Sequence, residues 1–267
     1  MIFIGEKING TRKAVKEAIL ASDRGYIERI SLEQANAGAD YLDVNAGTNP
    51  DRETGDMLWL LGIVQNVTDV PVCIDSSSPQ TLKAALEHVK RLPLVNSINA
   101  DPRRLESFVP LVKEKGCPVI ALALDESKSG MPKSTEERLE NIAKIFAKTR
   151  EMGIPDDRLF IDPLIMAVST DNNACMEALM CIQTIRERYP QAHITGGLSN
   201  ISFGLPKREL VNRTFLTLAM SAGMDSAVCD PANTALIESL KATDMLLGCD
   251  SFCRNYTVAA KRGFDKK

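Results

Sequence analysis

Residues 94–124, LVNSINADPRRLESFVPLVKEKGCPVIALAL, contain one complete copy of the pattern that decides the fold. A short apolar run, Leu94–Ile98, is followed by a polar cluster and then by an amphipathic stretch, Leu105–Lys115. Gly116, with a proline two residues later, is a typical end of a helix. The next apolar run, Val119–Leu124, begins directly after that proline. This order predicts a strand, a helix and a second strand.

The same unit recurs along the whole chain, with successive apolar runs starting about 20 to 40 residues apart, which suits alternating strands and helices. Most of these runs are apolar throughout, as expected of parallel strands that are buried on both faces. We therefore predict eight parallel strands. They are Ile2–Ile4, Tyr41–Val44, Pro71–Ile74, Leu94–Ile98, Val119–Leu124, Leu159–Ile161, Ala192–Thr195 and Asp225–Val228.

Helix signals lie between these strands. Ser134, followed three residues later by Glu137, forms a capping box ahead of one amphipathic stretch. A glycine follows directly after each of the clearest helices, as is common at helix ends. These helices are Ile27–Ala37, Leu105–Lys115, Thr135–Met152 and Asn212–Ala222.

The number of units and the length of 267 residues favour a closed (β/α)8 barrel, or TIM barrel, whose usual size is about 250 residues. An open doubly wound sheet is the alternative. That fold usually carries a GxGxxG or GxxxxGK[ST] turn after its first strand, and neither turn occurs here. We expect an α/β fold with a single domain, residues 1–267, in which Ser251–Lys267 forms an additional helix or tail.

Composition and charge exclude several classes of protein. Hydrophobic residues make up 44% and charged residues 25%, as in ordinary globular proteins. The net charge of −3 offers no basic excess for nucleic acid. No apolar run approaches the ~20 residues of a membrane helix, and the N-terminus lacks the features of a signal peptide. The seven cysteines show no CxxC spacing, and there are only two histidines. We expect a cytoplasmic protein without a bound metal.

The polar residues that follow the apolar runs are the candidate site, because TIM-barrel chemistry takes place at the carboxyl ends of the strands. Most of them are Asp and Asn, with few cations. They include Glu6, Asn9, Asp43, Asn45, Asp75, Asn96 and Asp162, and the turn Gly196–Gly197 that leads to Ser199 and Asn200. A phosphate site would offer more cations, and a Schiff-base aldolase needs a strand-end lysine, for which only Lys7 is near. The ring suits a neutral ligand rich in N–H donors, such as a pterin.

Structural roles are the alternatives for these residues. Asp75 is placed to cap the following helix, and Asp162 precedes a proline that shapes a turn. Asn96 lies inside an apolar run, where hydrogen bonding within the core would explain it. Asp43 and Asn45 suit a turn. The three aspartates together would also suit a divalent cation.

Seven short motifs, in order along the chain, resemble the methyltetrahydrofolate:corrinoid protein methyltransferases. This pterin-binding TIM-barrel family is related to the folate domain of cobalamin-dependent methionine synthase and, more distantly, to dihydropteroate synthase. Singly each motif is weak, but together they fall at successive strand ends over nearly the whole chain. The motifs are IGEKIN (4–9), LDVN (42–45), IDS (74–76), VNSIN (95–99), IDPL (161–164), GLSN (197–200) and NRTF (212–215).

The resemblance implies roles for individual residues. Asp75, Asn96 and Asp162 would bind the pterin, and Asn200 would contact N5 and act as the catalytic residue. Arg208, Gly197 and Ser199 would complete the substrate site, and Glu6, Asn9, Asp43 and Asn45 are further candidates.

The physical reason for an amide beside N5 is the leaving group. The methyl group sits on an amine nitrogen that must gain a proton or a hydrogen bond as the carbon–nitrogen bond breaks.

The resemblance further implies 5-methyltetrahydrofolate or tetrahydrofolate as substrate, a corrinoid carried by a separate protein, and a homodimer. Both directions of methyl transfer are compatible with these motifs. A condensing enzyme of the dihydropteroate synthase kind is one alternative function, and a non-catalytic pterin-binding protein is another.

Overall fold

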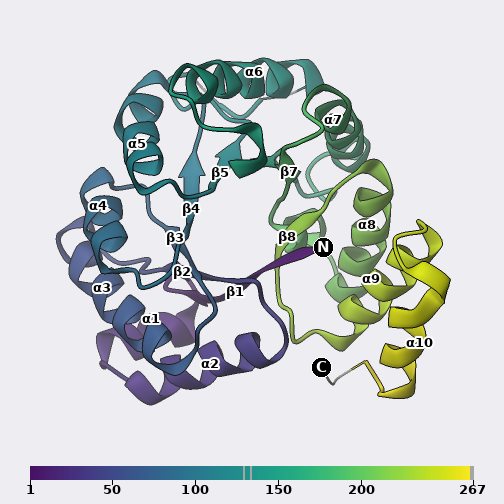
Figure 1. Ribbon diagram of the computed structural model, residues 1–267, viewed down its shortest axis with the longest axis horizontal. Coiled ribbons are helices and arrows are strands. Elements are labelled where there is room, and N and C mark those ends of the chain that lie inside the picture. The colour runs from purple at the N-terminus through teal and green to yellow at the C-terminus, as the bar shows by residue number, and fades with distance from the viewer. Residues whose placement is uncertain (129, 133, 265–267) are drawn as a thin grey trace.

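The computed structural model describes residues 1–128, 130–132 and 134–264, and within them the strands form a central ring surrounded by helices (Figure 1). Each predicted strand is present, with bounds that differ by a few residues. The strands are β1 (Ile2–Asn9), β2 (Tyr41–Asn45), β3 (Val72–Asp75), β4 (Leu94–Ile98), β5 (Val119–Leu122), β6 (Leu159–Asp162), β7 (His193–Ile194) and β8 (Ser226–Cys229).

The sheet is parallel and nearly closes on itself. Its strand order is β7-β6-β5-β4-β3-β2-β1-β8. At the remaining gap, Val228 N donates to Gly196 O at 3.0 Å and Asp225 N donates to Ile194 O at 3.3 Å. Gly197 forms one parallel bridge with Val228. The expected single-domain TIM barrel is confirmed, and the doubly wound alternative is wrong.

Helices cover the outside of the ring. All four helices singled out in the sequence are present, and their starts lie up to four residues earlier than expected because polar first turns precede the apolar stripe. The helices are α1 (Lys13–Leu20), α2 (Arg24–Asn36), α3 (Pro50–Val67), α4 (Pro79–His88), α5 (Pro102–Lys115), α6 (Thr135–Glu151), α7 (Ala174–Arg188), α8 (Arg208–Ala222), α9 (Thr234–Leu246) and α10 (Arg254–Lys261). Short 3-10 turns lie at η1 (Asp156–Arg158), η2 (Leu198–Ser202) and η3 (Ser251–Cys253).

Two apolar layers position the polar residues. The larger layer lies between the strands and the helices, and a smaller cluster of buried residues fills the inside of the barrel. That inner cluster comprises Ile4, Cys73, Leu94, Ile120 and Phe160. Successive side chains of a strand point to opposite faces. The residues two positions later therefore also face inward, and they are Glu6, Asp75, Asn96, Leu122 and Asp162. The inner cluster thus forms the floor of a polar mouth.

Strand β1 is longer than the apolar run predicted. It continues from Ile4 to Asn9, and its pairing with β2 shifts register between Gly5 and Ile8. The polar residues Glu6 and Lys7 interrupt the apolar pattern, which is why the sequence ended this strand too early. The last predicted segment begins with η3 and α10, and α10 lies outside α9 (Figure 1). Within the described residues, no helix is both long enough and apolar enough to span a bilayer.

Candidate active site

Two carboxylate–amide pairs join strands β2, β3 and β4 at the mouth of the barrel. Asn45 Nδ2 donates to Asp75 Oδ2 at 2.8 Å, and Asn96 Nδ2 donates to Asp43 Oδ1 at 3.1 Å. The sheet register places Asn45 beside Asp75, and Asp75 beside Asn96. Asp43 lies one layer deeper, level with Cys73. The structure therefore brings together four residues that the sequence singled out one by one.

Burial controls the charge of these two aspartates. Asp43 is only 3% exposed. Its burial, together with repulsion from Asp75, raises its pKa to about 8, although the hydrogen bond from Asn96 opposes the shift. Burial also raises the pKa of Asp75, against the hydrogen bond from Asn45 and the charge of Arg104. Burial and repulsion thus disfavour the charged form of Asp43, whereas the Asn45 hydrogen bond and Arg104 favour the charged form of Asp75.

Asp162 is on the other side of the mouth, at the end of β6. Its Oδ1 accepts the backbone N–H of Leu164 at 2.8 Å. Burial raises the pKa of Asp162 to about 6, while the Leu164 N–H and the positive charge of Arg138 oppose the rise. Gly196 lies against this carboxylate. A Cβ there would be 3.4 Å from Asp162 Oδ1 and 2.6 Å from Ile165 Cδ1, so a larger residue would force Ile165 to shift.

Asn200 lies in η2, the loop that follows Gly196 and Gly197. A Cβ on Gly197 would be 2.9 Å from Asn200 Nδ2, so the amide packs directly over that glycine. The Asn200 side chain is exposed, and its backbone N–H donates to Gly197 O at 3.1 Å. Of the two consecutive glycines, Gly196 therefore lies against the carboxylate of Asp162, and Gly197 lies against the amide of Asn200.

Arg208, the first residue of α8, anchors this loop through hydrogen bonds. Its Nη2 donates to Ser199 O at 2.7 Å, and its Nε donates to Ser202 Oγ at 3.0 Å. Ser202 Oγ in turn donates to Ser199 O at 3.2 Å. The structure thus uses the guanidinium to fix the loop that carries Asn200. The backbone of Ser199 is one of its anchors.

The two β1 candidates, Glu6 and Asn9, already have protein partners. Arg12 Nη2 donates to Glu6 Oε1 at 2.9 Å. Burial nevertheless raises the pKa of Glu6, with Arg12 opposing the shift. Asn9 Oδ1 accepts from Thr11 N at 2.9 Å and from Thr11 Oγ1 at 2.7 Å, which shapes the turn after β1. These two residues border the mouth and stabilise its loops.

Lys7 is not a free amine. Its Nζ forms ion pairs with Glu33 Oε1 at 2.7 Å and with Asp230 Oδ2 at 3.2 Å. Two carboxylates stabilise its ammonium form, and its pKa is raised although burial opposes this. A Schiff-base lysine needs the neutral amine. The environment of Lys7 therefore favours a structural role.

Comparisons with known proteins identify the family of this chain. The sequence model of the pterin binding enzyme family matches residues 7–230, from the last residues of β1 to just past the end of β8. The chain belongs to the pterin-binding enzyme family. It is 41% identical over 263 residues to a methylcorrinoid:tetrahydrofolate methyltransferase of Eubacterium limosum, which covers 98% of this chain and 97% of that relative.

More distant relatives of this pterin-binding enzyme share part of their length or the fold alone. A methionine synthase of Mycobacterium leprae is 30% identical over 241 residues. The match covers 85% of this chain but only 20% of the length of that methionine synthase. Dihydropteroate synthase from Xanthomonas albilineans, solved with 7,8-dihydropteroate, has a TM-score of 0.66 at 19% identity over 92% of each chain. Dihydropteroate synthase from Yersinia pestis, solved with a pterine-sulfa conjugate, has a TM-score of 0.67 at 13% identity over 94% of each chain. The two synthases show the shared fold.

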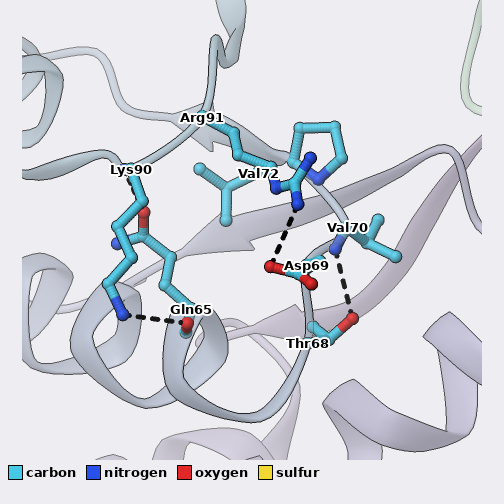
Figure 2. A pocket seen from close by; sticks show the side chains of 8 residues that line it. Gln65, Thr68, Asp69, Val70, Val72, Lys90 and Arg91 are labelled. Carbon is cyan, nitrogen blue, oxygen red and sulfur yellow. Dashed lines mark hydrogen bonds and ion pairs between the residues drawn. The ribbon is translucent and has the colours of Figure 1, made fainter.

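Two hollows of this pterin-binding enzyme lie away from the mouth. Figure 2 shows a small pocket beside Val72, which lies at the start of β3. Arg91 Nη2 and Asp69 Oδ1 form an ion pair at its edge, 3.1 Å apart. Asp75 ends the same strand, so this pocket is at the opposite end of the barrel. A larger groove on the outside is lined by parts of α2, α9 and α10. Across the described ranges, no group of three or more His, Cys, Asp or Glu is arranged to hold a metal ion.

One positioning residue of the mouth escaped the sequence reasoning. Arg104 on α5 donates from Nη1 to Ser77 O at 2.7 Å and from Nε to Ser97 O at 3.0 Å. Its guanidinium also lies 3.9 Å from the ring centroid of Phe108. It ties the end of β3 to the end of β4, next to Asp75. The sequence offered no signal for this role, because the first turn of a helix commonly contains polar residues and Arg104 is one of them.

Proposed function

We propose that this protein is a methyltransferase that moves a methyl group between N5 of tetrahydrofolate and the corrinoid of a separate protein. The relative that is 41% identical over nearly the full length of both chains carries the name of this reaction. The observation that carries the proposal is the mouth itself, where carboxylates and amides alternate and Arg104 is held by backbone carbonyls.

A pterin fits this set of groups. Its 2-amino and N3–H groups form a paired donor edge, for which an ionised carboxylate is the matching acceptor. Asp162 has one oxygen, Oδ2, with no hydrogen-bond partner in the described part of the chain. Asn45 Oδ1 is buried and likewise has no partner among those residues. We infer that Asp75, Asn96 and Asp162 bind the pterin ring.

Methyl transfer requires control of a proton at N5. Asn200 carries an exposed amide that packs against Gly197, and we infer that this amide donates a hydrogen bond to N5. An amide does not itself supply a proton. Burial raises the pKa of Asp162 to about 6 and that of Asp43 to about 8, and we infer that a carboxyl group of the mouth exchanges the proton. The corrinoid supplies the cobalt centre that gives or takes the methyl group.

The experiment that tests this function is an anaerobic absorbance assay with free cobalamin. The protein is mixed either with 5-methyltetrahydrofolate and cob(I)alamin or with tetrahydrofolate and methylcobalamin. The absorbance then reports methyl transfer in each direction. We expect protein-dependent interconversion of the two cobalamin spectra, and no product from p-aminobenzoate and a dihydropterin pyrophosphate. Tight folate binding without transfer, both to free cobalamin and to corrinoid proteins, would support a non-catalytic protein instead.

We further propose a homodimer that forms through α7 and α8, which pack side by side. Met176 and Met180 on α7 are 59% and 48% exposed, and Leu210 and Leu218 on α8 are 51% and 45% exposed. Exposed apolar side chains on neighbouring helices are typical of an interface. We also propose a cytoplasmic location, from the composition, and a single pterin-binding unit over residues 1–267.

A further inference from the structure

The seam between β7 and β8 is the junction of the ring that lacks a strand ladder within the described residues. These two strands lie at opposite ends of the strand order, and the single bridge between Gly197 and Val228 joins them. Every other neighbouring pair of strands shares at least two registered residue pairs. Contacts other than a ladder must therefore hold this seam closed.

Asp225, the residue before β8, makes the first of these contacts. Its Oδ1 accepts the backbone N–H of Ile194 at 2.8 Å, and its own backbone N–H donates to Ile194 O at 3.3 Å. The carboxylate thus takes the place of a main-chain carbonyl in a strand pair. At the next position, Ser226 Oγ donates to Thr195 Oγ1 at 3.2 Å, and both residues are fully buried. Side chains therefore align β8 with β7.

The second oxygen of the Asp225 carboxylate is also held. Its Oδ2 lies 3.0 Å from His193 Nδ1 and 3.2 Å from Arg186 Nη2. Arg186, on α7, also donates from Nη2 to Gly223 O at 2.8 Å, which ties the end of α7 to the residues before β8. Burial opposes the charged form of Asp225, but the hydrogen bond from His193, with the charge of Arg186, holds its pKa below the ordinary value. The carboxylate is therefore ionised at neutral pH and bonded through both oxygens.

The seam continues into the loop that carries Asn200. Three residues after Asp225, Val228 N donates to Gly196 O at 3.0 Å, and Val228 forms the bridge with Gly197. Gly197 O accepts the backbone N–H of Asn200 at 3.1 Å, and the Asn200 amide packs over this glycine. The alignment of β8 with β7 therefore fixes the position of Asn200.

We infer that Asp225 is a positioning residue for methyl transfer, which acts from the amino-terminal end of the barrel by fixing the seam between β7 and β8. The inference rests on the proposed function, because Asn200 is the residue that the seam places. The residues proposed to bind the pterin ring lie instead on β3, β4 and β6, which ladders join to their neighbours on both sides. Loss of Asp225 should therefore lower the rate and leave the affinity nearly unchanged.

The first experiment needs no substrate. Amide hydrogen exchange, read by mass spectrometry, compares full-length Asp225→Ala with the original protein. Exchange in residues 196–202 should become faster by about tenfold or more, as expected when a hydrogen bond to a charged group is lost locally. Exchange in residues 72–76 and 94–98, on the other side of the mouth, should be unchanged.

The second experiment separates rate from affinity. In Asp225→Ala the single-turnover rate of methyl transfer to cob(I)alamin should fall about tenfold or more, because a small displacement of a catalytic group is costly. The dissociation constant for 5-methyltetrahydrofolate should change by less than about threefold, since no contact with the pterin is lost. Asp225→Asn keeps an oxygen for the Ile194 N–H and should show a smaller loss of rate.

Asp40→Ala is the matched control. Asp40 makes the same contact at the start of β2, where its Oδ2 accepts the backbone N–H of Phe3 at 2.8 Å. A ladder between β1 and β2 continues that junction towards the mouth. Removing this carboxylate should therefore change neither the exchange of residues 196–202 nor the rate. An effect as large as that of Asp225→Ala would overturn the inference, since any carboxylate at a strand start would then suffice.

Three other results would also overturn it. They are unchanged exchange of residues 196–202 in Asp225→Ala, equal losses of rate and affinity, and failure of both Asp225 variants to fold. The last two would assign Asp225 to the stability of the whole barrel. An original protein that transfers no methyl group contradicts the proposed function instead, and the exchange experiment still decides whether Asp225 fixes the loop.

Discussion

At the scale of single residues, the proposed function assigns ligand binding and catalysis to different residues of the mouth. The carboxylates that suit the pterin edge lie on strands and are hydrogen-bonded to neighbours, as in the Asn45–Asp75 pair. Asn200 instead lies on a loop fixed by Arg208, with its amide exposed. This division predicts that substitutions on the strands change affinity, whereas substitution of Asn200 changes the rate.

For Asn200→Ala we expect the rate of methyl transfer to fall by about a hundredfold, as for the loss of a donor aimed at developing charge. The affinity for 5-methyltetrahydrofolate should change by less than about tenfold, because one neutral hydrogen bond contributes roughly 1 kcal/mol. Single-turnover absorbance gives the rate and equilibrium titration gives the affinity. Asn255→Ala, an exposed amide on α10, is the control. An unchanged rate in Asn200→Ala would remove the residue from the mechanism.

Asp43 predicts a pH dependence of stability. Its pKa of about 8 in the folded protein lies above the ordinary carboxyl value because burial and Asp75 disfavour its charge. The neutral form contributes stability that is complete below the ordinary pKa and is lost as the pH rises towards 8, by up to about 1.4 kcal/mol per unit. Asp43→Asn keeps an acceptor for Asn96 and never ionises.

The unfolding free energy of Asp43→Asn should therefore exceed that of the original protein by an amount that grows from pH 5 to pH 8. Urea denaturation without ligand at these two pH values measures it. An equal difference at both values would mean that Asp43 ionises in the folded protein as easily as in water.

At the scale of elements, the sequence predicted the strands best where both faces are buried. Strands such as β3 and β4 are apolar until their last inward residues, so a simple run marks them. The prediction for β1 ended too early because Glu6 and Lys7 are polar. Only the fold brings their partners close, for example Glu33 on α2 beside Lys7. The site residues followed from strand ends, but the pairs they form join residues 30 or 53 positions apart.

The same reasoning explains why Arg104 was missed. It occupies the first turn of a helix, where a charged side chain ordinarily meets solvent. Whether such a side chain turns inward depends on the neighbouring βα unit and not on the local pattern. The side-chain roles of outer helices are therefore the part of the site that sequence periodicity predicts least.

The paired helices α7 and α8 carry the prediction on assembly. Met180→Glu and Leu218→Glu would each bury an unpaired charge in the proposed dimer interface, which is costly. We expect both variants to be monomers by light scattering after size exclusion, where the original protein is a dimer. Leu20→Glu, on α1, changes an exposed apolar residue elsewhere and should remain a dimer. A monomeric original protein, or dimeric variants, would contradict an interface at α7 and α8.

At the scale of the whole molecule, the candidate site exists only when the barrel is closed. Its residues come from five different segments, namely Asn45, Asp75, Asn96, Asp162 and Asn200. The bridge between Gly197 and Val228 joins the loop that carries Asn200 to β8. An unfolded chain presents no such ring. We therefore expect folate binding to be coupled to global folding, and a ligand at a hundred times its dissociation constant should stabilise the fold by about 2.7 kcal/mol.

This coupling predicts the thermal response of the intact protein. Each kcal/mol shifts the melting temperature of a chain of this size by roughly 2–4 °C, so 5-methyltetrahydrofolate should raise it by roughly 5–10 °C at that excess. p-Aminobenzoate, which lacks the pterin edge, should leave it unchanged. Asp75→Asn and Asp162→Asn replace an acceptor by a donor towards the ligand N–H groups, so at the same ligand concentration their shifts should be much smaller. An equal shift in both variants would place the pterin away from these carboxylates, because stabilisation by a ligand measures only contacts made in the folded state.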